Sequence, residues 1–167
     1  VSNDQLAWYR ERYNIRVPAR VVYNAIDRIR PSLAADAGPR EGAPLFLMVG
    51  HFNGVRDQML VCRAMAVLAS RNVPFRMRFA GLGNRPELHA ACVEFCRASG
   101  ILDRVEFLGA RSDVPDLMAG SDLFVYASLH DTFGIALAEA MACGLPVVAN
   151  DLPVFREISQ PFHVARG

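Results

Sequence analysis

The chain has 167 residues, of which 52% are hydrophobic and 21% charged, and this is the composition of one ordinary soluble domain. Its 18 basic and 17 acidic residues leave a formal charge of +1, so the sequence lacks the excess positive charge with which proteins bind nucleic acid. The apolar runs are far shorter than the roughly 20 residues that a membrane span needs. The N-terminal residues also lack the basic start and apolar run of a signal peptide. We therefore expect a cytoplasmic protein with no nucleic-acid partner.

The first 44 residues are predicted to hold one helix, one short strand and a connector. Residues 3–13 read as a helix capped by Ser2 or Asn3, and the sequence ARVVY at 19–23 favours a strand. Residues 31–44 are rich in Pro, Ala and Gly and have no apolar period, which is typical of an exposed connector.

From residue 45 onward, apolar strand candidates alternate with helical segments. The strand candidates are 45–49, 75–80, 104–108, 122–127 and 145–149. The helical segments are 56–71, 86–98, 113–119 and 134–143. Because such alternation implies right-handed crossovers, the sequence predicts an α/β fold with a Rossmann-like parallel sheet and helices on both faces.

Ligands of such sheets bind at the carboxyl ends of the strands, and the first loop at that edge is predicted at 50–57. Gly50 and Gly54 leave its backbone free to approach a ligand, and Arg56 stands at the entrance of the next helix. A helix N-terminus beside an arginine can hold a phosphate. The alternative is a surface turn with a solvated arginine.

The second loop, AGLGNRPE at 80–87, has part of the dinucleotide-binding pattern G-x-G-x-x-G, with Pro86 where the third glycine belongs. It weakly supports an alternative function, that of a nicotinamide-dinucleotide-binding oxidoreductase domain. The other interpretation is that Gly81 and Gly83 only turn the chain.

The third loop leads into the predicted helix 134–143, and it carries the strongest signal. Glu139 is the only charged residue between Asp131 and Asp151, in a helix otherwise built of apolar residues, so we expect that helix to be buried all round. A buried carboxylate costs several kcal/mol unless hydrogen bonds satisfy it. Side chains lean toward the helix N-terminus, so Glu139 is expected to point back toward the turn that holds Asp131.

Two carboxylates would then face one helix start. We expect the first N–H groups of that helix to receive a phosphate or a sugar oxygen, while the carboxylates accept hydrogen bonds from hydroxyl groups. Such a site suits a polyhydroxylated, phosphorylated ligand. The alternative is a structural Glu139 bonded to backbone. The N–H groups concerned are those of Phe133, Gly134 and Ile135.

The segment from Gly50 to Glu157 resembles the donor-binding domain of glycosyltransferase family 4, which comprises retaining enzymes of the GT-B fold that use nucleotide-sugar donors. The matching motifs are VYNAID at 22–27, with Ala25 in place of the usual glycine, RVEFLG at 104–109, SDLFVYAS at 121–128 and DTFGIALAEAMACGLPVVAND at 131–151. The last motif is similar to the paired acids of the family, here Asp131 and Glu139.

The resemblance implies a role for each matching residue. Glu139 would bind the ribose hydroxyls of the donor, and Asp131 the hydroxyls of the transferred sugar. Arg56 would bind the diphosphate and stabilise the leaving group, so Asp131 and Arg56 are the implied catalytic residues. The stretch 107–109 would lie against the nucleobase. The implied donor-binding residues are Gly50, His51, Gly54, Arg56, Gly81, Leu108, Thr132, Phe133, Gly134, Ile135 and Glu139.

The resemblance also implies how the chain is organised. Residues 1–44 would be the end of an N-terminal region, a hinge and a connector, and 45–167 a nucleotide-sugar-binding domain truncated at its C-terminus. The acceptor would bind through an N-terminal domain absent from this chain, so we expect the chain alone to bind a UDP- or GDP-sugar without transferring the sugar. Neither a metal nor another cofactor is implied. The whole enzyme would act in polysaccharide, glycolipid or glycoconjugate synthesis, in the cytoplasm or peripherally at the inner face of the membrane.

Two departures from the family leave a further alternative open. His51 stands where the family commonly has a second arginine, and the first acid is Asp131 rather than glutamate. A noncatalytic interaction module that keeps the fold would permit both substitutions.

One group of residues has a spacing typical of metal ligands. His89, Cys92 and Cys96 fall three and four residues apart on one predicted helical face. The same face has the apolar register of a core stripe, and no C-x-x-C pair supplies further ligands. We therefore expect these residues to pack in the core, and the cysteines to be reduced thiols.

Overall fold

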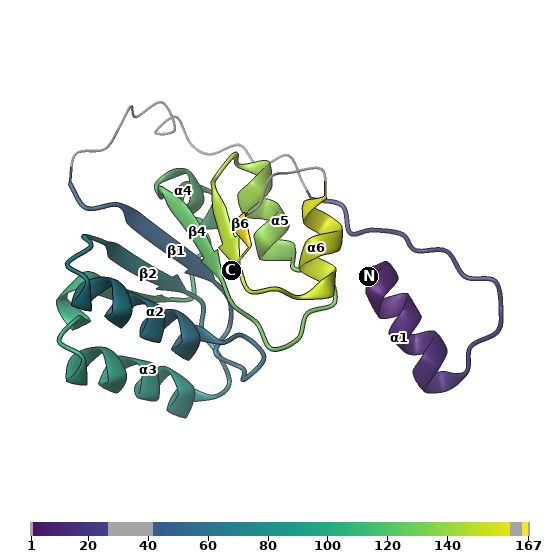
Figure 1. The fold of residues 1–167 in the computed structure, drawn as a ribbon, viewed down its shortest axis with the longest axis horizontal. Helices are drawn as coiled ribbons and strands as arrows, with labels where there is room; N and C mark the ends of the chain where they lie inside the picture. Colours follow the sequence, from purple (N-terminus) through teal and green to yellow (C-terminus); the bar gives the residue numbers. More distant parts are fainter. Residues whose placement is uncertain (1, 27–41, 161–164, 167) are drawn as a thin grey trace.

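The computed structural model describes residues 2–26, 42–160 and 165–166, and its centre is a six-stranded parallel sheet (Figure 1). The strand order is β3-β2-β1-β4-β5-β6. The strands are β1 (Leu45–Val49), β2 (Arg76–Ala80), β3 (Val105–Gly109), β4 (Leu123–Tyr126), β5 (Val147–Ala149) and β6 (Ala165–Arg166). The predicted α/β class and parallel sheet are confirmed, and all five predicted strands form. β6 was not predicted, because its two residues form too short a run to detect.

Helices connect successive strands, as the alternation predicted. They are α1 (Asn3–Tyr13), α2 (Gln58–Ser70), α3 (Pro86–Ala98), the 3₁₀ helix η2 (Leu102–Arg104), α4 (Val114–Ala119), α5 (Ile135–Ala142) and α6 (Pro153–Ser159). α2 begins later than predicted because Asp57 caps it, accepting a hydrogen bond from the Leu60 N–H at 2.9 Å. α6 was not predicted, although Pro153 in its first turn is an ordinary helix-start signal.

The strand order reverses between β1 and β4, which are hydrogen-bonded neighbours. The chain runs outward from β1 through β2 to β3, returns to β4 and then runs outward on the other side to β6. Right-handed crossovers place the helices of the two halves on opposite faces of the sheet. α2 and α3 lie together beside β1 and β2, and α5 and α6 lie beside β5 and β6 (Figure 1).

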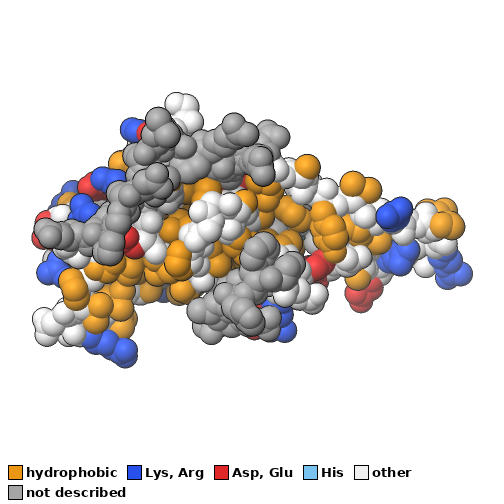
Figure 2. Space-filling view, turned by 90° about the horizontal axis from the view of Figure 1, so that it is seen from above, with side chains coloured by type: hydrophobic (Ala, Val, Ile, Leu, Met, Phe, Trp, Pro, Cys, Tyr) orange, Lys and Arg blue, Asp and Glu red, His pale blue; other side chains and the backbone are white. Residues whose placement is uncertain are grey.

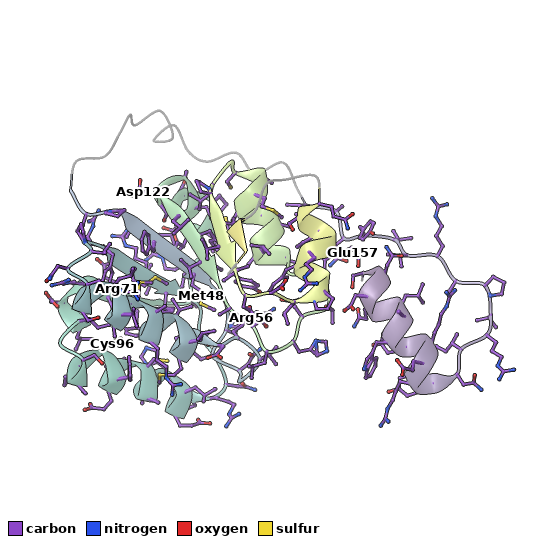
Figure 3. The ribbon with its side chains drawn as sticks, in the orientation of Figure 1. Met48, Arg56, Arg71, Cys96, Asp122 and Glu157 are labelled. Atoms are coloured by element: carbon purple, nitrogen blue, oxygen red, sulfur yellow. The ribbon has the colours of Figure 1, made fainter. Side chains whose placement is uncertain are left out.

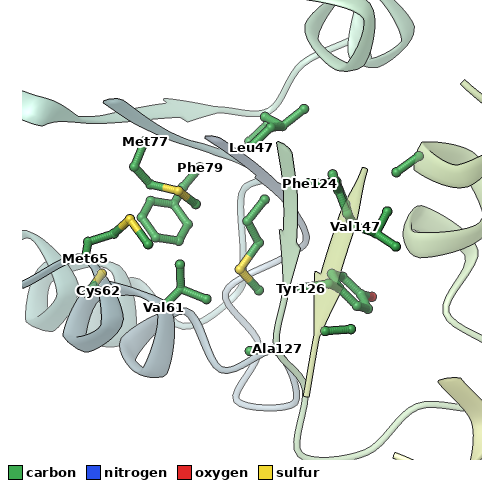
Figure 4. Packing of buried hydrophobic residues seen from close by; sticks show 14 of the residues in the cluster. Leu47, Val61, Cys62, Met65, Met77, Phe79, Phe124, Tyr126, Ala127 and Val147 are labelled. Carbon is green, nitrogen blue, oxygen red and sulfur yellow. The ribbon is translucent and has the colours of Figure 1, made fainter. Parts of the chain in front are cut away.

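The core fills both faces of the sheet with apolar side chains. Leu47, Met77 and Phe124, on three different strands, are completely buried. Figure 4 shows Val61 and Met65 of α2 on the face of the sheet toward which α2 packs. This packing holds the strands rigidly, so their carboxyl ends form a fixed platform for the loops that follow them.

The N-terminal region differs from the prediction in one respect. α1 and its Ser2 cap are confirmed, with the Ser2 hydroxyl accepting from the Gln5 N–H at 3.1 Å. The strand predicted at 19–23 is wrong: the segment pairs with no strand, and Val22 is 75% exposed. A β-prone sequence forms a strand only where a neighbour accepts its hydrogen bonds. Residues 31–41 of the predicted connector lie outside the described residues.

The surface carries charges of both signs. On the face shown in Figure 2, basic and acidic side chains lie at both ends of the molecule around a hydrophobic middle, in line with the formal charge of +1. Among the residues that the structure describes, no helix is long and apolar enough to cross a membrane.

Candidate functional site

The candidate site lies at the carboxyl edge of the sheet, where the strand order reverses. In open α/β sheets, this is where a crevice for ligands forms. The loops after β1 and β4 are joined here by a short antiparallel bridge between Arg56 and Ser128. The Asp57 N–H donates to the Ala127 carbonyl at 3.0 Å, and the Leu129 N–H donates to the Val55 carbonyl at 2.8 Å. The bridge brings two predicted site loops together.

An ion pair between Arg56 and Asp131 spans the two loops. The Arg56 Nη1 lies 3.0 Å from the Asp131 Oδ2, and the side chains are 21% and 5% exposed, respectively. The Arg56 guanidinium also lies over the ring of Tyr126, 5.2 Å from the ring centre. A pair so shielded from water interacts more strongly than a surface pair. The structure thus joins the two predicted catalytic residues, which the sequence placed in separate loops.

The carboxylate of Asp131 also holds the start of α5. Its Oδ1 accepts hydrogen bonds from the N–H groups of Phe133 at 3.1 Å and Gly134 at 2.8 Å, and the Tyr126 hydroxyl donates to its Oδ2 at 3.2 Å. The prediction that the Phe133 and Gly134 N–H groups face a ligand is therefore wrong in this structure. The Asp131 carboxylate reaches those N–H groups first because it lies only two and three residues upstream, in the turn that leads into α5.

Arg56 keeps donors for another partner. Its Nη1 carries the described contacts, namely those with Asp131, with the Ser128 hydroxyl at 2.8 Å and with the His130 carbonyl at 3.3 Å. Within residues 2–26, 42–160 and 165–166, its Nε and Nη2 donate no hydrogen bond. Gly50 makes room for the stem of this side chain, because a Cβ at Gly50 would lie 3.1 Å from the Arg56 Cγ.

Three polar residues that the sequence analysis missed support the two loops. Ser128 is buried, and its hydroxyl donates a hydrogen bond to a loop carbonyl while accepting one from Arg56. Asn150 clamps the Ser128 backbone, accepting from its N–H and donating to its carbonyl, both at 2.9 Å. The buried Gln58 donates to the carbonyls of Gly50 and His51, both at 3.2 Å. A polar side chain directly after an apolar strand was the available signal for Ser128 and Asn150.

Glu139 projects from α5 without a partner. Its carboxylate accepts no hydrogen bond and joins no ion pair among the described residues, and burial raises its pKa above the usual range of a glutamate. The expected full burial of this helix is wrong, because Ile135 is 50% exposed and Glu139 is only partly buried. α5 packs on β4 and β5, and other side chains of the helix keep exposed surface. The alternative of a Glu139 bonded to backbone is also not observed.

The phenol of Tyr126 connects the two acids electrostatically. Burial raises its pKa most; the positive charge of Arg56 opposes that rise, and the charge of Asp131, its hydrogen bond and the charge of Glu139 add to it. Arg56 and Asp131 form one ion pair beside this hydroxyl, and Glu139 on α5 is the second acid of the predicted site.

The glycines of the second loop have a structural explanation. A Cβ at Gly81 would lie 2.2 Å from the Gly50 carbonyl oxygen, and a Cβ at Gly83 would lie 1.9 Å from that of Phe52. Both positions thus need glycine so that the loop after β2 can pack on the loop after β1. This removes the feature that supported a dinucleotide site. His51 is exposed, and its ring Nδ1 forms a hydrogen bond with the Leu82 carbonyl oxygen.

Two other predicted features lie near the end of β3. Leu108 is partly buried on this strand, whereas Phe107 stacks on Phe79 with the ring centres 5.2 Å apart. Phe107 therefore belongs to the core rather than to a free nucleobase surface. His89 packs edge-on against Phe107 at 5.1 Å, and Cys92 and Cys96 are buried, so the expected core packing of these three residues is confirmed. In the part of the chain that the structure describes, no three His, Cys, Asp or Glu side chains are grouped to hold a metal ion.

The chain is similar to known proteins over most of its length. The family model of glycosyl transferases group 1 matches residues 30–165. The N-acetyl-alpha-D-glucosaminyl L-malate synthase of Bacillus anthracis is 31% identical over 147 residues, which cover 84% of this chain and 38% of that protein. The lipopolysaccharide core biosynthesis mannosyltransferase LpsB of Rhizobium meliloti is 32% identical over 151 residues, 85% of this chain and 43% of that protein.

A solved structure is also similar to this chain. The crystal structure of Anabaena Alr3699/HepE in complex with UDP-glucose superposes with a TM-score of 0.64 and 26% identity, over 69% of this chain and 32% of that one. The chain spans less than half the length of each of these relatives.

Proposed function

The chain belongs to the group 1 glycosyl transferases, and on that premise we propose that it is the donor-binding part of a retaining enzyme that transfers a sugar from a UDP- or GDP-sugar to an acceptor. The observation that carries the proposal is the Arg56–Asp131 ion pair at the reversal of the strand order. The UDP-glucose bound to the Anabaena relative supports a nucleotide-sugar as the donor.

In this proposal, Arg56 binds the diphosphate. Its Nε and Nη2 are the donors not used within the described residues, and a guanidinium can give two parallel hydrogen bonds to phosphate oxygens. Asp131 and Ser128 hold Nη1, so the cation is oriented before the ligand arrives. A cation fixed in this way stabilises the negative charge that develops on the leaving diphosphate without moving during the reaction.

The two carboxylates bind hydroxyl groups. Among the described residues, Glu139 accepts no hydrogen bond that a ligand would have to break, so ribose hydroxyls can donate to it directly. Asp131 accepts on Oδ1 from the turn before α5, and its Oδ2 contacts Tyr126 and Arg56, so in this proposal a hydroxyl of the transferred sugar binds Asp131 by replacing the Tyr126 hydroxyl. Thr132 and Ile135 line the same turn. Gly50, Gly54, Gly81 and Leu108 would shape the backbone around the donor, and His51 would add a partial charge.

Calorimetric titration of the chain with UDP, GDP and ADP tests the proposal, with a chelator present throughout. We expect a nucleoside diphosphate to bind without a divalent ion, because the site supplies its own cation. Arg56→Met should weaken binding by about 10- to 100-fold, the equivalent of one hydrogen bond to a charged group. Arg63→Met, an exposed arginine on α2, is the matched control and should leave the affinity unchanged. Binding that needs a divalent ion, or that survives Arg56→Met, contradicts the proposal.

The organisation of the whole protein is part of the same proposal. We propose that residues 1–44 are the end of an N-terminal region, a hinge and a connector, and that the acceptor binds mainly through an N-terminal domain of the full-length enzyme. Synthesis of a polysaccharide, glycolipid or glycoconjugate, in the cytoplasm or at the inner face of the membrane, rests on the family resemblance.

The chain alone should bind the donor without transferring its sugar. Orientation of the acceptor hydroxyl against the anomeric carbon can supply ~7 to 11 kcal/mol of the barrier, and most of that would come from the N-terminal domain. The anomeric configuration of the product of the full-length enzyme, followed by NMR, tests the retaining mechanism. Transfer by this chain at the rate of the full-length enzyme would refute the division of roles.

A further inference from the structure

The carboxylate of Asp131 has a donor at each of its acceptor positions. A carboxylate offers about four lone-pair positions, two on each oxygen. Oδ1 accepts from the N–H groups of Phe133 and Gly134. Oδ2 accepts from the Tyr126 hydroxyl and contacts Nη1 of Arg56. The guanidinium therefore finds one position on this carboxylate, and the tyrosine hydroxyl occupies the position beside it.

The contact between Arg56 and Asp131 uses one guanidinium nitrogen, although the planar guanidinium fits a carboxylate with two parallel hydrogen bonds. Nη1 lies 3.0 Å from the Asp131 Oδ2, whereas Nε and Nη2 donate to no group within the described residues. Figure 3 shows Arg56 beside the ends of β1 and β4. The second nitrogen has no acceptor on Asp131 because the Tyr126 hydroxyl fills the remaining lone pair of Oδ2.

Tyr126 is held firmly enough to keep this place. It is the last residue of β4 and only 2% exposed, and Figure 4 shows it at the end of that strand. Its ring centre lies 5.8 Å from that of Phe124 and 5.5 Å from that of Phe155. The Arg56 guanidinium lies over the same ring, 5.2 Å from its centre, in an attractive cation–π arrangement. One core side chain thus contacts both partners of the ion pair.

We propose that Tyr126 is a positioning residue of the donor site, whose hydroxyl restricts the ion pair to one nitrogen of Arg56 and leaves the other edge of the guanidinium open for the diphosphate. The inference rests on the proposed function, in which Arg56 binds the diphosphate. Without the hydroxyl, Asp131 would accept from a second nitrogen of Arg56, and the ligand would have to break that hydrogen bond. A sugar hydroxyl that replaces the Tyr126 hydroxyl fills the same lone pair, so the cation stays open when the whole donor is bound.

Tyr126→Phe removes the hydroxyl and keeps the ring in the core. Calorimetric titration with UDP, with a chelator present, should show an affinity about 2- to 10-fold below that of the wild type, the equivalent of one hydrogen bond. Circular dichroism checks that the variant is folded. Tyr13→Phe, at an exposed position of α1, is the matched control and should leave the affinity unchanged. An affinity of Tyr126→Phe equal to that of the wild type would overturn the proposal.

The same substitution in the background of Asp131→Asn separates positioning from packing. A neutral amide does not form the two-nitrogen pair with Arg56, so Tyr126→Phe should change the UDP affinity of Asp131→Asn by less than about 2-fold. A general loosening of the core would lower the affinity equally in both backgrounds. That result would show that Tyr126 does not act through Asp131.

NMR of the arginine side chains tests the hydrogen-bond pattern without any ligand. The signals of Arg56 are identified by their loss in Arg56→Met. In Tyr126→Phe, we expect one more N–H of Arg56 to be protected from exchange with solvent than in the wild type. Unchanged protection refutes the positioning role, whatever the affinities. If the wild-type chain binds no nucleotide, the proposed function fails, and the NMR comparison still decides whether Tyr126 restricts the ion pair.

Discussion

The ion pair between Arg56 and Asp131 should stabilise the fold as well as serve the donor site, and Asp131→Asn tests this. The substitution keeps the shape of the side chain but removes its charge. The amide oxygen can still accept from the Phe133 and Gly134 N–H groups, so the start of α5 is retained. The new amide N–H₂ then faces the Arg56 guanidinium, where a carboxylate stood at 3.0 Å.

The size of the effect follows from the exposure of the two partners. Breaking a fully buried ion pair costs about 3 to 5 kcal/mol, and a hydrogen bond to a charged group is worth about 1.5 to 3 kcal/mol. Asp131 is 5% exposed, but Arg56 is 21% exposed and keeps Ser128 and the His130 carbonyl as acceptors. We therefore expect the free energy of unfolding to fall by about 2 to 3 kcal/mol, a large part of the 5 to 15 kcal/mol typical of a domain.

Urea denaturation measures this loss. With a slope of about 2 kcal/mol per molar urea, the midpoint should fall by about 1 M. Asp113→Asn is the control, since Asp113 pairs with Arg111 on the open surface and its loss should leave the midpoint nearly unchanged. In the background of Arg56→Met, Asp131→Asn should cost clearly less, because the partner charge is gone. Equal effects of Asp131→Asn and Asp113→Asn, or strictly additive losses for Arg56 and Asp131, would refute the reasoning.

Three further predictions concern other parts of the molecule. Glu139→Gln should weaken UDP binding by ~1 to 3 kcal/mol and yet raise the urea midpoint at neutral pH. Burial raises the pKa of Glu139, so its ionised form costs stability above the ordinary glutamate pKa. A variant that loses both binding and stability contradicts this prediction. Burial raises the pKa of Glu157, but the hydrogen bonds from Asn3, Tyr23 and Asp4 together outweigh that effect and lower it. The contribution of Glu157 to holding α1 is therefore present above the ordinary glutamate pKa of about 4.3 and is lost only as the pH falls further. Trp8 emission should stay constant down to that pH, and a transition above it would show that Glu157 does not hold α1. Gly83→Ala should lower the free energy of unfolding by about 3 kcal/mol or more, because a Cβ there meets the Phe52 carbonyl oxygen at 1.9 Å. Gly100→Ala is the control: its Cβ meets no atom within 4 Å, so it should cost only the strain of the left-handed backbone, about 1 kcal/mol. Similar losses for the two variants would contradict the close packing of the loops after β1 and β2.

Much of the fold could be predicted from the sequence, because local chemistry decides it. The apolar run at 45–49 coincides with β1, and Pro86 begins α3 as predicted. Strands and helices of this kind are specified by residues a few positions apart. The same local logic explains one error: ARVVY has strand-forming residues, but strand formation also requires a neighbouring strand, and none pairs with it.

The candidate site could be predicted only as a set of loops. Glycines, Arg56 and the two acids marked the loops after β1 and β4, since the chemistry of each residue is visible in the sequence. The sequence did not show which N–H groups are free for a ligand. The Asp131 carboxylate accepts from the Phe133 and Gly134 N–H groups, and this contact depends on the folded conformation of the turn.

Contacts between distant residues were decided by the tertiary structure alone. The partner of Arg56 depends on the reversal of strand order that makes β1 and β4 neighbours, and no local pattern encodes that adjacency. The docking of α1 depends on Glu157, 154 positions from Asn3, in a helix that the sequence analysis did not predict. Propensity and patterning act over one or two turns of chain, whereas the energy of an ion pair or a helix cap across the molecule depends on distances that exist only after the sheet has formed.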